Sequence, residues 1–193
     1  MTVKERITAL REVMAEKKID AYLVPTDDFH ASEYVGEYFK CRKYITGFTG
    51  SAGRAVIMQD MAGLWTDGRY FIQAAAQLEG TGVELFKMGE PDVPTVHQFL
   101  EEKLGEGMCL GFDGRTVSAE EADELAELLA KKGATLQTDS STFVSTGFAC
   151  PFYIQFHNRF TGKCRTIFPD FSYQIKIRLK SGSFFCKKFG QFI

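Results

Sequence analysis

The first 138 residues alternate between apolar positions at helical spacing and short apolar runs of strand length. Apolar residues recurring every three to four positions mark the buried face of a helix, and runs of four to six residues mark buried strands. This pattern predicts helices over 3–18, 69–78, 94–104 and 118–132. Strands are predicted over 19–24, 54–59, 63–66, 83–87, 108–112 and 134–138.

Capping signals support several of these boundaries. Thr2 with Glu5, and Ser118 with Glu121, have the spacing of a capping box. Pro94 is expected in the first turn of its helix, where a missing N–H costs nothing. The helical spacing places these side chains toward the core: Val3, Ile7, Leu10, Met14, Phe71, Ala74, Ala75, Leu78, Ala122, Leu125 and Leu129.

The order of these elements defines a fold class. Strands and helices mostly alternate, with one hairpin inserted over 54–66. Such an order predicts an α/β domain with a mixed six-stranded sheet flanked by helices. The polar and aromatic stretch over 26–53 is interpreted as a long connection.

Composition changes abruptly after residue 138. Residues 1–138 carry 15 Lys+Arg and 23 Asp+Glu, whereas residues 139–193 carry 8 Lys+Arg and 2 Asp, with 11 of the 18 Phe and no Glu. Such a step marks a boundary, so we expect a domain over 1–138 and an atypical tail over 139–193. A shifted reading frame, a divergent extension and the start of a second domain that is cut short all remain open.

The tail has few signals of regular structure. Phe152, Phe156 and Phe160 are spaced by four, but a proline, an asparagine and a glycine nearby disfavour a stable helix. Residues 173–179 alternate weakly, as in a strand. We therefore predict an irregular tail.

The apolar runs, the cysteine count and the charge exclude several classes of protein. No apolar run approaches the roughly 18 residues that a membrane span needs, and the N-terminus lacks the apolar segment of a signal peptide. The cysteines are odd in number and form no CxxC pair, which disfavours a disulfide framework or a zinc finger. The first 138 residues are acidic, which disfavours a nucleic-acid partner. The sequence therefore predicts a cytoplasmic protein with no nucleic-acid or membrane partner.

Two polar segments could carry chemistry. Asp27, Asp28 and His30 could begin a metal site, but no further ligand cluster stands out, and a polar loop with one aspartate capping a turn is favoured. The segment 47–53 is rich in glycine, but it lacks the Lys-Ser/Thr ending of a phosphate-binding loop and leads into a strand. A tight glycine loop is the favoured interpretation.

The segment Trp65-Thr66-Asp67-Gly68-Arg69-Tyr70-Phe71 runs from a strand through a turn into a helix. Arg69 falls in the first turn of that helix, where a cation opposes the helix dipole. An arginine held there needs an anionic or carbonyl partner. That partner is either a ligand or a local acid such as Asp67.

Together these segments resemble the N-terminal domain of the Xaa-Pro aminopeptidases, or aminopeptidase P, of the cytosolic three-domain type. The resemblance covers roughly residues 3–138, and two dense motifs appear in the family's order and spacing. It is carried by His30, Ser32-Glu33-Tyr34, Arg42, Gly47-Phe48, Gly50-Ser51-Ala52-Gly53 and Trp65 to Phe71, and it continues through Gln73-Ala74, Val93-Pro94-Thr95 and Gly111-Phe112-Asp113.

The resemblance implies a creatinase/prolidase-type N-terminal domain that is not itself catalytic. In the family, a second domain of similar fold and a catalytic domain follow, and the catalytic domain holds two metal ions, typically Mn²⁺. These enzymes remove the N-terminal residue from peptides with proline in second position and are commonly homodimers. The resemblance also makes Arg69 a substrate-contacting residue, supported by His30, Trp65, Asp67, Gly68 and Tyr70.

The sequence departs from the family at about Asp139, and the family's five metal ligands belong to the part that has no counterpart here. We therefore expect a truncated chain with no catalytic or metal-binding residue of its own, inactive alone. Two alternatives stay open. The domain could be a stand-alone peptide- or partner-binding module that uses Arg69 and the 26–53 loop, or a non-catalytic subunit of a separate peptidase chain.

Overall fold

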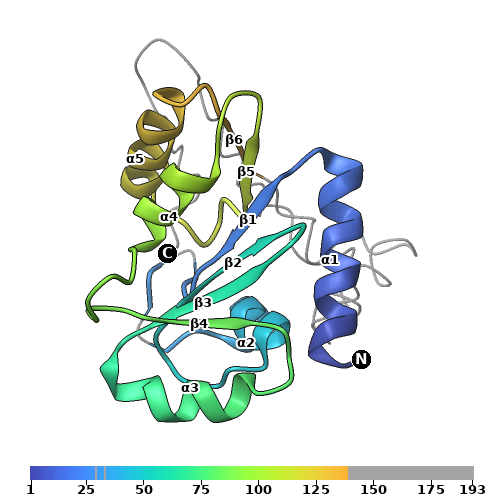
Figure 1. The fold of residues 1–193 in the computed structure, drawn as a ribbon, viewed down its shortest axis with the longest axis vertical. Coiled ribbons are helices and arrows are strands. Elements are labelled where there is room, and N and C mark those ends of the chain that lie inside the picture. Colours follow the sequence, from blue (N-terminus) through green and yellow to red (C-terminus); the bar gives the residue numbers. More distant parts are fainter. Residues whose placement is uncertain (29, 33, 139–193) are drawn as a thin grey trace, which may run out of the picture. The chain divides into compact units, whose positions relative to one another are not determined.

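A six-stranded sheet lies between two layers of helices in the computed structural model, which describes residues 1–28, 30–32 and 34–138 (Figure 1). The strand order is β4-β3-β2-β1-β5-β6. Within this part of the chain, only β2 runs against the other strands. The predicted mixed six-stranded sheet is confirmed. The strands are β1 (Ala21–Val24), β2 (Arg54–Met58), β3 (Ala62–Thr66), β4 (Glu84–Lys87), β5 (Cys109–Phe112) and β6 (Thr135–Thr138).

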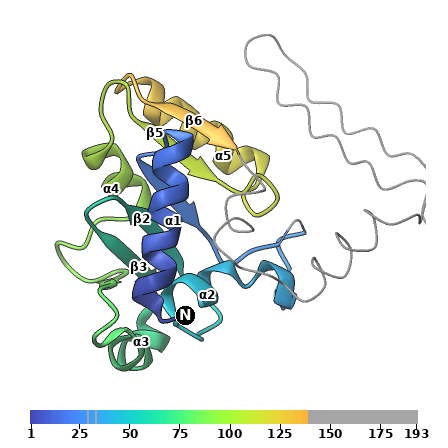
Figure 2. The same cartoon turned by 90° about the vertical axis from the view of Figure 1, so that its right-hand side faces the viewer.

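Helices cover both faces of this sheet (Figures 1 and 2). Three of them pack on one face and two on the other, each with its own buried apolar cluster. The first face carries α1 (Val3–Lys17), α2 (Cys41–Thr46) and α3 (Phe71–Leu78), and the second carries α4 (Val96–Lys103) and α5 (Ala119–Ala130); two short 3₁₀ turns are η1 (Glu37–Phe39) and η2 (Gly68–Tyr70).

Strand β1 shows how the two clusters divide the sheet. Tyr22 and Val24 belong to the cluster under α1, α2 and α3, whereas Ala21 and Leu23 belong to the cluster under α4 and α5. All four side chains are buried. A strand buried on both faces has no polar side, which explains why the sequence shows continuous apolar runs rather than alternation.

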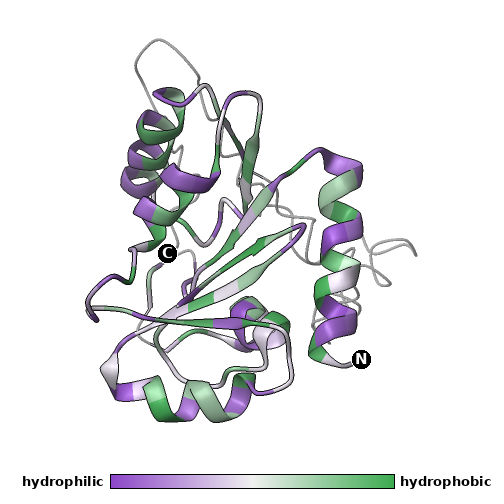
Figure 3. Ribbon diagram, in the orientation of Figure 1, coloured by the Kyte–Doolittle hydropathy of each residue, from purple (hydrophilic) through white to green (hydrophobic). Residues whose placement is uncertain are grey.

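Helix α1 follows its local sequence signals. The Thr2 side chain accepts a hydrogen bond from the backbone of Glu5, and the Glu5 carboxylate accepts one from the backbone of Thr2. The predicted capping box is therefore confirmed. Ile7, Leu10 and Met14 are buried as predicted, and polar residues fill the outer face (Figure 3).

The predicted start of the helix over 94–104, which is α4 in the structure, is wrong. Pro94 precedes the helix instead of lying in its first turn, because Thr95 is the N-cap residue of α4. Thr95 accepts from the backbone N–H of Gln98, and the Gln98 side chain accepts from the backbone of Thr95. This second capping box sets the start of the helix after the proline.

Helices α3 and α5 each differ in one detail. Ala75 is exposed, whereas Ala74 and Leu78 are buried, because the short helix turns a narrower face inward than its spacing suggested. At the start of α5, Ser118 accepts from the backbone of Glu121 as predicted. The Glu121 carboxylate completes no capping box and pairs with Arg54 of β2 instead.

The predicted long connection over 26–53 contains a helix that the sequence patterns did not indicate. Helix α2 is six residues long, begins without a side-chain cap and ends at Gly47, which adopts a left-handed conformation. A helix this short depends on tertiary contacts for its stability. Ile45 of α2 is fully buried, which supplies such a contact.

The tail lies outside the described residues, together with its phenylalanine spacing and the weak strand pattern over 173–179. The predicted boundary between 138 and 139 stays a prediction. Within the described ranges, no helix has the length and apolar character needed to cross a bilayer.

Candidate functional site

The carboxyl ends of β1, β3 and β5 lie along one edge of the sheet, where β2 begins (Figure 1). Polar residues follow each of these ends, namely Thr26 after β1, Asp67 after β3 and Asp113 after β5. Arg54 stands at the start of β2. This is the edge where open α/β sheets most often bind ligands.

At the end of β3, Asp67 and Arg69 form a paired group. Arg69 donates to Asp67 from its backbone N–H (3.0 Å), from Nε (2.9 Å) and from Nη2 (2.8 Å). These side-chain hydrogen bonds lower the pKa of Asp67 and raise that of Arg69. The Arg69 side chain is nevertheless 71% exposed. The interpretation of Arg69 as paired with a local acid is confirmed, and the pair faces solvent.

Tyr70 supports this pair from the other side. Its hydroxyl is hydrogen-bonded to the Ser51 hydroxyl at 2.7 Å, and this bond lowers the pKa of Tyr70. The Arg69 guanidinium carbon lies 5.4 Å from the centre of the Tyr70 ring, within cation–π range. Phe48 meets the same ring edge-on at 5.8 Å. The loop over 47–53 therefore contacts the Arg69 group through Tyr70.

Arg42 anchors that loop from inside the protein. Its Nε donates to the Thr26 hydroxyl (2.6 Å), Nη1 donates to the Phe48 carbonyl (2.9 Å), and Nη2 donates to the Gly50 carbonyl. Burial lowers the pKa of Arg42 to about 10. The sequence offered only the presence of Arg42 in a family-like segment, so its role as an anchor was missed.

The glycines of this loop do what a tight loop requires. Gly47 has a φ of +78°, which favours glycine. Gly50 packs so closely against Phe48 and Tyr70 that a β-carbon would clash with both rings. The interpretation of 47–53 as a tight glycine loop is confirmed.

The other predicted site residues are dispersed. Trp65 is fully buried, stacks on Phe86 at 4.0 Å and donates from Nε1 to the Pro94 carbonyl at 2.8 Å. Gly68 lies beside Asp67 and Arg69 at the exposed turn. His30 is exposed on the loop after β1. The structure thus groups Asp67, Gly68, Arg69 and Tyr70, places Trp65 in the core, and sets His30 in a different loop.

The loop after β1 forms a capped turn. Asp28 Oδ1 accepts from the backbone N–H groups of His30 (2.9 Å) and Ser32 (3.1 Å). The predicted capping by an aspartate is confirmed. In the stretches that the structure describes, no three His, Cys, Asp or Glu side chains gather in a way that could hold a metal ion. These residues therefore do not fit the two Mn²⁺ ions that the resemblance implies.

The pKa values of the neighbouring Asp27 and Asp28 carboxyls are shifted in opposite directions from that of an ordinary aspartate. The backbone hydrogen bond from His30 lowers the pKa of Asp28. Burial raises the pKa of Asp27, and Glu121 adds to this while Arg54 opposes it. An NMR titration of the carboxyl carbons should show Asp27 taking up a proton first as the pH falls. The reverse order would contradict the burial of Asp27 beside Glu121.

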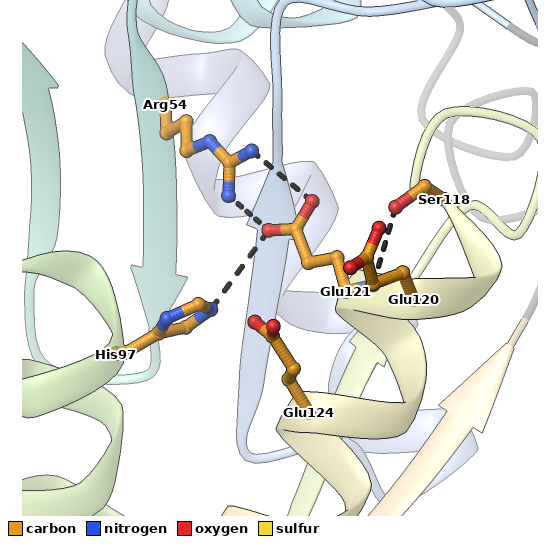
Figure 4. A pocket seen from close by; sticks show the side chains of 6 residues that line it. All are labelled: Arg54, His97, Ser118, Glu120, Glu121 and Glu124. Atoms are coloured by element: carbon orange, nitrogen blue, oxygen red, sulfur yellow. Dashed lines mark hydrogen bonds and ion pairs between the residues drawn. The ribbon is translucent and has the colours of Figure 1, made fainter.

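A pocket of about 290 Å³ lies between β2, α4 and α5 (Figure 4). The Arg54 guanidinium pairs with the Glu121 carboxylate, and His97 Nε2 lies 3.9 Å from Glu121 Oε1. The Arg54–Glu121 pair joins the start of β2 to the first turn of α5 and so fixes the position of α5 against the sheet. The lining residues are Arg54, His97, Ser118, Glu120, Glu121 and Glu124.

The sheet order and the polar residues after its strands define an α/β domain with an exposed aspartate–arginine pair at the carboxyl ends of those strands. Comparison with known families assigns it more closely. The Creatinase/Prolidase N-terminal domain model matches residues 6–144, and the chain belongs to that family.

Curated relatives agree with this assignment. The chain is 44% identical over 138 residues to Aminopeptidase P2 of Arabidopsis thaliana, covering 70% of this chain and 19% of the relative. It is 48% identical over 128 residues to a Probable Xaa-Pro aminopeptidase P of Pyrenophora teres f. teres, covering 66% and 19%. The chain therefore spans about a fifth of the length of these relatives.

Solved structures share the fold. The X-prolyl aminopeptidase of Caenorhabditis elegans, described as a cytosolic enzyme with a di-nuclear active site, superposes with a TM-score of 0.71 and 33% identity, covering 77% of this chain and 26% of that one. The N-terminal domain of the cytoplasmic peptidase PepQ of Mycobacterium tuberculosis gives 0.53 and 30%, covering 73% and 97%. The predicted family resemblance and fold are confirmed.

Proposed function

We propose that this chain supplies the non-catalytic N-terminal domain of a Xaa-Pro aminopeptidase and that Arg69 contacts the peptide substrate. The observation that carries the proposal is the exposed Arg69 side chain at the carboxyl end of β3. Two side-chain hydrogen bonds to Asp67 hold it, and the Arg69 backbone N–H donates a third. A donor fixed in this way loses little freedom when it binds an acceptor, which favours recognition.

The rest of the enzyme follows from the same proposal. The whole protein would hydrolyse the bond before proline in peptides with proline in second position, act in the cytoplasm and form a homodimer. Its two metal ions, Mn²⁺ by the family resemblance, would be held by a catalytic domain and not by the residues described here. The related enzyme of Caenorhabditis elegans, with its di-nuclear active site, supports this division of roles.

Arg69→Ala is expected to lower kcat/KM for Xaa-Pro peptides by about 10- to 100-fold, since a hydrogen bond from a charged group contributes about 1.5–3 kcal/mol. The measurement needs a catalytic domain, so residues 1–138 would replace the corresponding segment of the Caenorhabditis elegans enzyme. Initial rates with a proline-containing tripeptide and Mn²⁺ then give kcat/KM for the chimera and its variant.

Arg115→Ala in the same chimera is the matched control, because Arg115 follows another strand of the same edge and already binds Tyr38. It should keep most of the kcat/KM. An unchanged kcat/KM for Arg69→Ala would show that Arg69 is only structural. Turnover by the purified 193-residue chain with Mn²⁺, well above background, would contradict a non-catalytic role.

A role as a partner-binding module or as a subunit of a separate peptidase chain is the second candidate. Ile72 favours it, because this large apolar side chain is 90% exposed on α3, one helical turn beyond Arg69. A single bond from Arg69, at about 1.5–3 kcal/mol, falls short of the roughly 4 kcal/mol of even a millimolar complex. Such a module would need further contacts, and co-purification with a catalytic chain from the native cell would favour this role.

A further inference from the structure

The aspartate–glycine–arginine group at the end of β3 occurs a second time at the end of β5, as Asp113-Gly114-Arg115. The two groups have matching geometry. Arg115 donates to Asp113 from its backbone N–H (3.0 Å), Nε (2.9 Å) and Nη2 (2.6 Å). The corresponding distances in the Arg69 group are 3.0, 2.9 and 2.8 Å. One local arrangement therefore appears twice along one edge of the sheet.

The two groups differ in what the remaining nitrogen contacts. Nη1 of Arg115 donates to the hydroxyl of Tyr38 at 2.5 Å, and its guanidinium carbon lies 5.1 Å from the Tyr38 ring centre. Nη1 of Arg69 has no hydrogen-bond partner among residues 1–28, 30–32 and 34–138. The Arg69 side chain is 71% exposed, against 32% for Arg115. In the Arg115 group, Nη1 thus already donates to a protein oxygen, whereas the Nη1 of Arg69 is available to a ligand.

Tyr38 brings an uncharged oxygen to Nη1 of Arg115, and the charges within the group explain why such an oxygen is suitable. Asp67 contacts Nε and Nη2 of Arg69 and balances the positive charge of the guanidinium. A carboxylate or phosphate approaching Nη1 would meet no net positive charge and would be repelled by the nearby Asp67 carboxylate. An amide carbonyl would accept the Nη1 hydrogen without that repulsion.

We infer that Asp67 determines the class of ligand that Arg69 binds: Nη1 of Arg69 donates to a neutral oxygen, such as a peptide carbonyl, and Asp67 disfavours carboxylates and phosphates. The inference rests on the proposed function for the idea that a peptide is the natural ligand. It adds that the contact is made to the uncharged backbone of the peptide and not to a terminal carboxylate.

Inorganic phosphate tests whether Arg69 binds anions. It is titrated into the full 193-residue chain labelled with ¹⁵N, and binding is followed by the shift of the Nε–Hε resonance of Arg69. Asp67→Asn keeps a side-chain oxygen that can cap the 3₁₀ turn over Gly68–Tyr70, but it removes the negative charge. This variant should bind phosphate at least about tenfold more tightly than the unmodified chain. Asp113→Asn makes the same change in the second group. As the matched control, it should leave the phosphate response of Arg69 unchanged.

N-methylacetamide tests whether Arg69 binds a neutral oxygen, because it offers an amide carbonyl and carries no charge. It should shift the Arg69 resonance in the unmodified chain and about equally in Asp67→Asn. Thermal unfolding confirms that each variant is folded, and Asp67→Ser is a second uncharged replacement if Asp67→Asn is not.

Equal phosphate affinity with and without the Asp67 charge would overturn the inference, as would an Arg69 that does not respond to N-methylacetamide. The proposed function fails separately. If N-methylacetamide and phosphate behave as expected but a Xaa-Pro tripeptide amide leaves Arg69 unshifted, the role of Asp67 stands and the proposed substrate does not.

Discussion

Arg42→Ala is expected to lower the free energy of unfolding by about 4 kcal/mol, because two buried carbonyls would lose their hydrogen-bond donor at about 1–3 kcal/mol each. Arg42 is 4% exposed and donates to the carbonyls of Phe48 and Gly50 as well as to the Thr26 hydroxyl. Denaturant unfolding followed by circular dichroism measures the loss.

Arg11→Ala provides the matched control for this prediction. Arg11 also donates to a backbone carbonyl, that of Met58 at 2.7 Å, but it makes one such bond from a half-buried position. Its loss should cost only about 1 kcal/mol. Similar losses for both variants would mean that the Phe48 and Gly50 carbonyls find water when Arg42 is removed, and that Arg42 does not anchor the loop.

Trp65→Ala is the second large effect, with an expected loss of about 4 kcal/mol, the range found for truncating a large buried aromatic side chain. Trp65 is fully buried, stacks on Phe86 and meets Phe99 edge-on at 4.9 Å. Its indole N–H also satisfies the Pro94 carbonyl. Thermal and denaturant unfolding of the purified chain would both report the change.

Trp65→Phe separates the two contributions of this side chain. It keeps an aromatic ring against Phe86 but removes the donor to Pro94, so its loss should be about 1–2 kcal/mol. If the phenylalanine variant is as unstable as the alanine variant, the hydrogen bond to Pro94 outweighs the packing. If neither variant is destabilised, Trp65 is retained for function and not for the core.

Local signals predicted most of the fold correctly. Thr2 and Glu5 set the start of α1 by contacts three residues apart, which can be seen in the sequence. Helix α2 could not be predicted in that way, because it has no side-chain cap and is held by buried tertiary contacts such as that of Ile45. The start of α4 was within reach, since Thr95 and Gln98 have the spacing of a capping box.

In the candidate site, too, the contacts between residues close in sequence were predictable and those between distant residues were not. The pairing of Asp67 with Arg69 spans two residues and was anticipated, and the second group at Asp113 is visible in the sequence once the first is understood. The burial of Arg42 was not foreseeable, since arginine is seldom buried and its acceptors come from a loop whose path depends on Gly47. Glu121 likewise looked like a capping residue and instead pairs with a distant strand.

The order of the strands has a consequence for synthesis on the ribosome. Strands β1, β2 and β3 follow one another in sequence and lie together in the middle of the sheet, so each can pair with a neighbour that has already emerged. Strand β4 then adds beside β3, β5 adds beside β1, and β6 adds last beside β5. Because the N-terminal part of a chain leaves the ribosome first, the central strands of this sheet are available before its outer strands, and no late strand has to be inserted between earlier ones. The free edge of β1 stays open until β5 emerges, and that interval is when the nascent chain is most exposed to wrong partners.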